Sequence, residues 1–234
     1  MTNADRFLDA YAQIEHELKK ELNLKRHVRF YELLDLACKK NPVVRRYKFD
    51  LQEYGDLRNA IVHNRGGGKV IAQPNDDTVK KIERIAGLLT KPPRVISFFQ
   101  KEVIMVAAEE PLSKALRLLD RYNYSQLPII KKDVIAGLLT SNMIVRWMAA
   151  ALENDCIGLQ EVCVRDLLSF SGKKDNYKIV AAMTSLYEVQ DLFCLYQAKA
   201  HKLEAVLITR NGRPEEKILG IITNLDLPLL QRQL

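Results

Sequence analysis

The chain has 234 residues, of which 47% are hydrophobic and 28% are charged, with a formal net charge of +7 at pH 7. This length suits two or three compact domains better than one small domain. No run approaches the roughly 20 consecutive apolar residues of a membrane span, and the first residues, MTNADRFLDA, lack the charged-then-apolar order of a secretory signal. We therefore expect a soluble, cytoplasmic protein.

The basic charge is concentrated in the first two fifths of the chain. Residues 1–92 contain 18 Lys and Arg against 13 Asp and Glu, a balance of +5, and residues 93–234 contain 18 against 16, a balance of +2. This asymmetry favours a polyanionic partner for the N-terminal part. A basic surface that is merely solvated explains the charge equally well.

The cysteines do not indicate a metal or redox site. Cys38, Cys156, Cys163 and Cys194 include no C-x-x-C pair. We expect reduced, mostly packed thiols and no bound metal.

Residues 1–92 have the pattern of an all-helical bundle. The first helix carries apolar residues spaced by three or four positions, which form one buried stripe: Phe7, Tyr11, Ile14, Leu18 and Leu22. A second helix is expected within residues 28–40, ending before Asn41-Pro42 because proline blocks its continuation.

Two further helices complete this region. Leu51, Tyr54, Leu57 and Ile61 mark the third helix, which the glycines at 66–68 are expected to end. The fourth begins near residue 74, where acidic residues suit a helix start, and extends to about residue 89. The adjacent prolines in TKPPR then predict a domain boundary near residues 91–94.

Beyond this boundary, short β-branched runs alternate with helical patterns. We expect the following strands and helices in chain order: strand 102–107, helix 111–123, strands 126–130 and 134–140, helix 141–152, strand 177–183, helix 185–200, strands 204–210 and 217–223, and helix 224–233. Asn211-Gly212 is the expected turn of the last hairpin.

The same order of elements occurs twice. The segment AGLLTSNM at 136–143 aligns with LGIITNLD at 219–226, at a separation of 83 residues. Two copies of one β-α-β-β-α unit, at residues 93–155 and 156–234, explain this repeat. The predicted fold class is α+β, an N-terminal all-α bundle followed by two β-α-β-β-α repeats.

The repeat resembles a tandem pair of CBS (cystathionine β-synthase) domains, or Bateman module, over residues 95–234. Each copy closes with a strand of the form Gly-apolar-apolar-Thr before a helix, and YSQLPII is similar to the family's second strand with its proline. The resemblance implies a dimerising regulatory module that binds an adenine nucleotide, AMP, ADP or ATP, as a regulatory ligand. No cofactor is implied.

Thr223 and Asp226 match the family's nucleotide-binding positions. A threonine at a strand end places a hydroxyl where a phosphate can lie, and an aspartate one turn later can accept hydrogen bonds from both ribose hydroxyls. In the first repeat Thr140 matches, but Met143 stands where the aspartate is expected, and a thioether cannot bind a diol. We therefore expect one ribonucleotide site per chain. An ordinary helix N-cap is the alternative explanation of the Thr223 and Asp226 pair.

Arg58, Asn59 and His63 form a second candidate site, on the third helix. Asn59 and His63 are four residues apart and share a helix face. RNAIVH resembles the Arg-polar-x-x-x-His motif of the HEPN superfamily, and residues 1–92 match its helical make-up. The resemblance implies a metal-independent endoribonuclease that acts as a dimer and leaves a 2′,3′-cyclic phosphate and a 5′-hydroxyl.

The three side chains suit this chemistry. His63 can transfer a proton near neutral pH, Arg58 can stabilise charge on a phosphoryl group, and Asn59 can orient either group. A histidine near a helix C-terminus is, however, stable without any catalytic task. Non-catalytic binding and a purely structural role remain open for this cluster.

The sequence thus predicts a nucleotide-regulated, RNA-cleaving homodimer. The competing prediction is a non-catalytic energy-state sensor whose helical domain mediates dimerisation or binds a protein or nucleic-acid partner.

Overall fold

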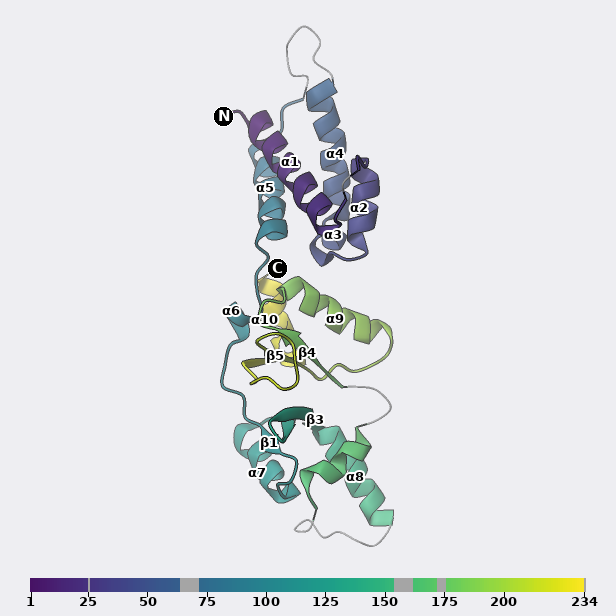
Figure 1. Ribbon diagram of the computed structural model, residues 1–234, viewed down its shortest axis with the longest axis vertical. Coiled ribbons are helices and arrows are strands. Elements are labelled where there is room, and N and C mark those ends of the chain that lie inside the picture. The colour runs from purple at the N-terminus through teal and green to yellow at the C-terminus, as the bar shows by residue number, and fades with distance from the viewer. Residues whose placement is uncertain (25, 64–71, 154–161, 172–175, 234) are drawn as a thin grey trace. The chain divides into compact units, whose positions relative to one another are not determined.

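The computed structural model describes residues 1–24, 26–63, 72–153, 162–171 and 176–233. The chain divides into two compact units, Met1–Pro93 and Arg94–Leu234. Their elements are labelled in Figure 1. Among the described helices, none is long and apolar enough to cross a membrane.

The first unit is helical, as the sequence predicts. Its described helices are α1 (Asn3–Glu21), α2 (Phe30–Cys38), α3 (Pro42–Arg46), α4 (Lys48–His63) and α5 (Asp76–Thr90). The helix α1 packs against α5, α2 and α4, and Figure 1 shows it lying alongside α5.

The apolar stripe of α1 forms the centre of this unit's core. Phe7, Ile14 and Leu18 are fully buried, and they pack in one cluster with the apolar face of α5. A capping box starts α1, because the Thr2 side chain accepts a hydrogen bond from the Asp5 N–H and the Asp5 carboxylate accepts one from the Thr2 N–H. The predicted helical period is therefore confirmed here.

The short helix α3 was not expected from the sequence. Asn41-Pro42 does end α2, but the same two residues also start α3. The Asn41 side chain accepts hydrogen bonds from the N–H groups of Val43 and Val44, and Pro42 occupies the first turn, where its missing N–H costs nothing. The glycines at 66–68, expected to end α4, lie outside the described residues.

The second unit contains two three-stranded sheets. Its described elements, in chain order, are α6 (Ile96–Phe99), β1 (Val106–Ala107), α7 (Leu112–Tyr122), β2 (Gln126–Lys131), β3 (Val134–Thr140), α8 (Ser141–Glu153), the 3-10 helix η2 (Val164–Phe170), β4 (Tyr177–Ala181), α9 (Leu186–Ala198), β5 (Ala205–Thr209), β6 (Gly220–Thr223), the 3-10 helix η3 (Asn224–Asp226) and α10 (Leu227–Arg232). The predicted mixture of helix and sheet is confirmed.

The two sheets have the same internal arrangement. In the first, β1 pairs parallel with β2, and β2 pairs antiparallel with β3. In the second, β4 pairs parallel with β5, and β5 pairs antiparallel with β6. Ile135 of β3 and Leu207 of β5 lie in one buried cluster together with Val103, so the two sheets share a core.

The expected strand 102–107 is much shorter in the structure. Only Val106 and Ala107 pair with β2. Val103 is buried in the cluster shared by the two sheets instead of joining the ladder. The apolar run 102–107 therefore contributes both to the pairing with β2 and to the core between the two sheets. The alternation of apolar residues alone does not distinguish these two roles.

A close backbone approach fixes the start of β6. Gln100 forms a β-bridge with Gly220, and the Lys101 N–H donates to the Leu219 carbonyl at 3.1 Å. A Cβ added at Gly220 would lie 2.1 Å from the Phe99 carbonyl oxygen. Glycine is thus required here because only hydrogen fits.

Candidate functional site

Thr223 and Asp226 lie together at the C-terminal end of β6. The Asp226 Oδ2 atom accepts hydrogen bonds from the Thr223 N–H at 2.8 Å and from the Thr223 hydroxyl at 2.9 Å. Thr223 ends the strand in an extended conformation, and η3 begins at the next residue. The predicted one-turn spacing therefore brings the two side chains into contact.

The second carboxylate oxygen of Asp226 is available to a ligand. Within the described part of the chain, no residue donates a hydrogen bond to Asp226 Oδ1. The side chain is only partly buried. A carboxylate held by one oxygen and open at the other is a fixed acceptor for neutral hydroxyl donors.

A cavity of about 420 Å³ adjoins this pair. It is bordered by residues 101–104, residues 123–126, Pro128, Ile221, Thr223, Leu225 and Asp226. This volume lies within the range of small-molecule sites. Apolar side chains from Ile104, Pro128 and Ile221 form part of the lining, and Tyr124 stacks on Tyr122 with ring centroids 5.6 Å apart.

Sequence reasoning did not find these lining residues. The sequence indicates a strand at YSQLPII, whereas its first residues, Tyr124 and Ser125, also border the cavity. The segments that line the cavity are far apart in the sequence and come together only in the folded protein. Their local sequence patterns do not indicate a binding site.

Thr140 lies at a different cavity from Thr223 and Asp226. This second cavity, of about 290 Å³, is bordered by Thr140, Met143, Arg146, Asn176 and Lys202, among others. Thr140 is buried, and its hydroxyl accepts a hydrogen bond from the Met143 N–H at 3.3 Å. Met143 is also buried, with its sulfur 4.0 Å from the Asn176 amide nitrogen. Met143 thus takes the position that Asp226 holds in the second repeat, and the carboxylate that borders this cavity is Glu204, from a different element.

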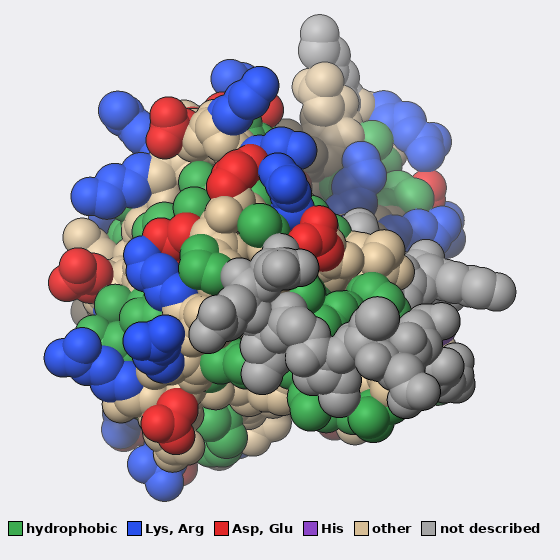
Figure 2. Space-filling view, turned by 90° about the horizontal axis from the view of Figure 1, so that it is seen from below, with side chains coloured by type: hydrophobic (Ala, Val, Ile, Leu, Met, Phe, Trp, Pro, Cys, Tyr) green, Lys and Arg blue, Asp and Glu red, His purple; other side chains and the backbone are tan. Residues whose placement is uncertain are grey.

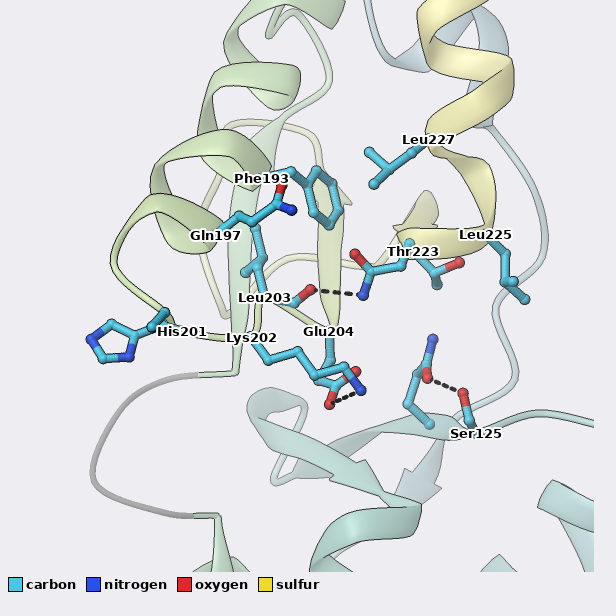
Figure 3. A pocket seen from close by; sticks show the side chains of 13 residues that line it. Ser125, Phe193, Gln197, His201, Lys202, Leu203, Glu204, Thr223, Leu225 and Leu227 are labelled. Atoms are coloured by element: carbon cyan, nitrogen blue, oxygen red, sulfur yellow. Dashed lines mark hydrogen bonds and ion pairs between the residues drawn. The ribbon is translucent and has the colours of Figure 1, made fainter.

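A third cavity, of about 650 Å³, connects the surroundings of the other two. Figure 3 shows its lining, with Thr223 and Leu225 on one side and residues 201–204 on the other. The Asn224 side-chain amide donates to the Leu203 carbonyl at 3.1 Å, which ties η3 to the segment just before β5.

Arg58 and Asn59 lie near the end of α4. Arg58 is half-buried and Asn59 is exposed, and the Arg58 Nη1 atom donates to the Asn59 Oδ1 atom at 3.4 Å. His63 is the last residue of α4, and its side chain lies outside what the structure describes. The structure therefore brings two members of the predicted cluster together.

The surroundings of Arg58 include acidic and phenolic groups that the sequence did not reveal. The Tyr31 hydroxyl donates to Asp56 Oδ1 at 2.5 Å, and this bond raises the pKa of Tyr31. Burial raises the pKa of Tyr11, and the nearby Arg58 guanidinium opposes that rise. Asp56 and Asn59 are three residues apart, so α4 presents them on the same side.

The surface charges do not form one basic patch on the face shown in Figure 2. Lys and Arg side chains of the described residues are interspersed there with Asp, Glu and apolar side chains. Groups of three or more His, Cys, Asp or Glu suitable for a metal ion are absent among the described residues. Cys38, Cys163 and Cys194 are free thiols.

Comparison with protein families identifies one part of the chain. Residues 95–150 match the CBS domain family, so the resemblance inferred from the sequence is confirmed for that segment. The resemblance of residues 1–92 to HEPN domains stays a prediction. None of the curated proteins compared with the chain matches it.

Solved structures with similarity to the chain share low sequence identity with it. An uncharacterized conserved protein from Pyrococcus horikoshii is 20% identical, with a TM-score of 0.45, and covers 61% of this chain and 94% of its own. CBSX2 in complex with AMP is 17% identical, with a TM-score of 0.44, covering 60% and 97%.

The CBS domain pair of protein MJ0100, in complex with 5′-methylthioadenosine and S-adenosyl-L-methionine, is 19% identical, with a TM-score of 0.42, covering 60% and 97%. At TM-scores below 0.5 these similarities support no conclusion about the function of this chain.

Proposed function

We propose that residues 94–234 form a regulatory module of two CBS repeats that binds one adenine nucleotide at Thr223 and Asp226. The observation that carries the proposal is the fixed Asp226 carboxylate. Its Oδ2 atom is held by Thr223, and the residue borders a cavity of about 420 Å³.

The chemistry of the cavity suits a nucleoside. The two hydroxyls of a ribose can donate to the open side of Asp226, and hydrogen bonds to a charged acceptor contribute about 1.5–3 kcal/mol each. The apolar side chains of Ile104, Pro128 and Ile221 offer a surface for a planar base. At the cavity beside Thr140, Met143 takes the position that Asp226 holds in the second repeat. The carboxylate that borders this cavity, Glu204, is paired with Lys202. We therefore place the ribose at Asp226 alone.

A thermal-shift experiment tests this proposal. Full-length protein is heated with AMP, ADP, ATP, NAD, S-adenosylmethionine or cyclic di-AMP, a panel that includes ligands held by two of the similar structures. At least one nucleotide is expected to raise the melting temperature, because a ligand that binds only the folded state stabilises it. Asp226→Ala is expected to abolish this shift.

Asp166→Ala provides the matched control. Asp166 Oδ2 accepts from the Cys163 N–H at 2.9 Å in the same capping arrangement as Asp226. Asp166 borders none of the three cavities described above. The control separates loss of a cap from loss of a ligand contact. The proposal fails if no nucleotide raises the melting temperature of the wild type. It also fails if a nucleotide raises the melting temperatures of Asp226→Ala and Asp166→Ala by the same amount.

We propose RNA cleavage by the helical unit as a second function, regulated by the first. The observation that favours it is the contact between Arg58 and Asn59 on a helix that also carries His63. In this proposal the RNA 2′-hydroxyl attacks the phosphorus and the bond from phosphorus to the 5′-oxygen breaks, which leaves a 2′,3′-cyclic phosphate and a 5′-hydroxyl. Arg58 stabilises the charge on the phosphoryl group, and His63 transfers a proton.

Incubation with total RNA in EDTA tests the second function. The enzyme is supported if the wild type cleaves the RNA and if Arg58→Ala and His63→Ala abolish the cleavage. The control His16→Ala on α1 is expected to preserve it. RNA that stays intact with every nucleotide supports the non-catalytic sensor instead. Regulation further requires the nucleotide to bind two arrangements of a homodimer unequally.

A further inference from the structure

The 650 Å³ cavity of Figure 3 adjoins the proposed nucleotide site. The two cavities share Ser125, Gln126, Thr223 and Leu225 in their linings. A ligand whose ribose is held by Asp226 therefore has space into which its remaining groups can extend.

The polar side of this cavity carries one ion pair. Lys202 Nζ lies 3.0 Å from Glu204 Oε1, drawn as a dashed line in Figure 3. Lys202 is the single Lys or Arg among the described residues that line the cavity. His201 also borders it, but Figure 3 shows its imidazole directed away from the other labelled side chains.

The two partners of the ion pair differ in exposure. The Lys202 side chain is 65% exposed and that of Glu204 is 12% exposed. Glu204 is also held by its backbone, because its N–H donates to the Asn176 carbonyl at 2.7 Å. The carboxylate is thus anchored, whereas the ammonium group is largely exposed and accessible to a ligand.

We infer that Lys202 is the specificity-determining contact for the phosphate chain of the bound nucleotide. This inference depends on the proposed nucleotide site at Asp226. When the nucleotide binds, its phosphates extend into the 650 Å³ cavity and accept hydrogen bonds from the Lys202 ammonium group. A phosphate carries more negative charge than a carboxylate and competes with Glu204 for this cation. Glu204 therefore weakens phosphate binding by holding Lys202 in the free protein.

Calorimetric titration of full-length protein with adenosine, AMP, ADP and ATP tests the inference. In the wild type, affinity is expected to rise from adenosine to the phosphorylated ligands. Lys202→Met is expected to reduce the affinity for AMP and ATP about tenfold, the value of one charge-assisted hydrogen bond. Adenosine affinity is expected to stay unchanged, because adenosine lacks the group that Lys202 contacts.

Glu204→Gln should have the opposite effect. Removing the competing charge frees Lys202, so affinity for AMP and ATP is expected to increase while that for adenosine stays the same. The matched control is Lys199→Met, an equal charge loss at an exposed residue just after α9 that does not line the cavity.

The outcomes separate this inference from the function it depends on. If Lys202→Met and Lys199→Met leave the same ratio of ATP to adenosine affinity, Lys202 has no role in phosphate binding, although the nucleotide site stands. If the wild type binds no ligand of the series, or if Asp226→Ala binds all of them normally, the proposed site itself is wrong.

Discussion

Glu216 lies in the connection between β5 and β6, where it holds the turn at Asn211. Its carboxylate accepts hydrogen bonds from the Asn211 N–H at 2.6 Å and from the Asn211 side-chain amide at 2.5 Å. These bonds are the main cause that lowers the pKa of Glu216 from 4.5 to about 2. A carboxylate with a lowered pKa stabilises the folded state only where it is ionised.

The predicted consequence is a pH-dependent loss of stability. Because the folded pKa is depressed, the contribution of Glu216 is complete above pH 4.5 and disappears as the pH falls through about 2. The stability difference between wild type and Glu216→Gln is expected to shrink over this window. Urea denaturation at several pH values measures it, with exposed Glu215→Gln as the control. A difference that stays constant or grows with acidification contradicts the prediction.

Sequence reasoning succeeded at the residue scale where contacts are local. Thr223 and Asp226 are three residues apart, so one helical turn brings them together. Contacts between distant segments were not predictable in this way. Tyr31 contacts Asp56 because α2 packs on α4. Lys202 borders the 650 Å³ cavity because it lies in the connection between α9 and β5.

At the scale of elements, the two repeats contain glycines at matching positions with different surroundings. A Cβ at Gly220 would lie 2.1 Å from the Phe99 carbonyl oxygen, which is backbone and cannot move alone. A Cβ at Gly137 would lie 2.6 Å from Leu168 Cδ2, the end of a flexible side chain. The aligned sequences alone give no reason to expect this difference.

The two alanine substitutions should therefore differ in effect. Gly220→Ala is expected to destabilise the protein by about 3 kcal/mol, at the upper end of the usual cost of overpacking. Gly137→Ala is expected to cost about 1 kcal/mol, since Leu168 can change rotamer. Urea denaturation compares them. If both variants lose the same free energy of unfolding, or if Gly137→Ala loses more, the close contact between Gly220 and the Phe99 carbonyl does not constrain β6.

Element boundaries were less predictable than element types. The helical period of α1 and the paired runs of β2 and β3 follow directly from apolar spacing. The helix α3 was missed because Asn41-Pro42 serves both as a stop for α2 and as a start for the next helix. The strand β1 is short because Val103 packs in the core shared by two sheets, which depends on tertiary structure.

At the scale of the whole molecule, the division at Pro93 predicts a separable nucleotide-binding unit. The described residues that line the three cavities all belong to Arg94–Leu234. Residues 94–234 produced alone are expected to fold and to bind AMP within about threefold of the full chain, as an independent domain would. Circular dichroism and calorimetry measure both properties. A fragment that folds but does not bind would show that the helical unit completes the site.

The central claim is that Asp226 binds the ribose of an adenine nucleotide. A nucleotide analogue that lacks the ribose hydroxyls tests this claim most directly. Wild-type protein is titrated with AMP and with 2′,3′-dideoxy-AMP, which lacks both hydroxyls but keeps the base and the phosphate. AMP is expected to bind at least about tenfold more tightly, because the analogue leaves the Asp226 carboxylate without donors. In Asp226→Ala the two ligands should bind equally. Equal affinity of both ligands for the wild type would contradict the claim.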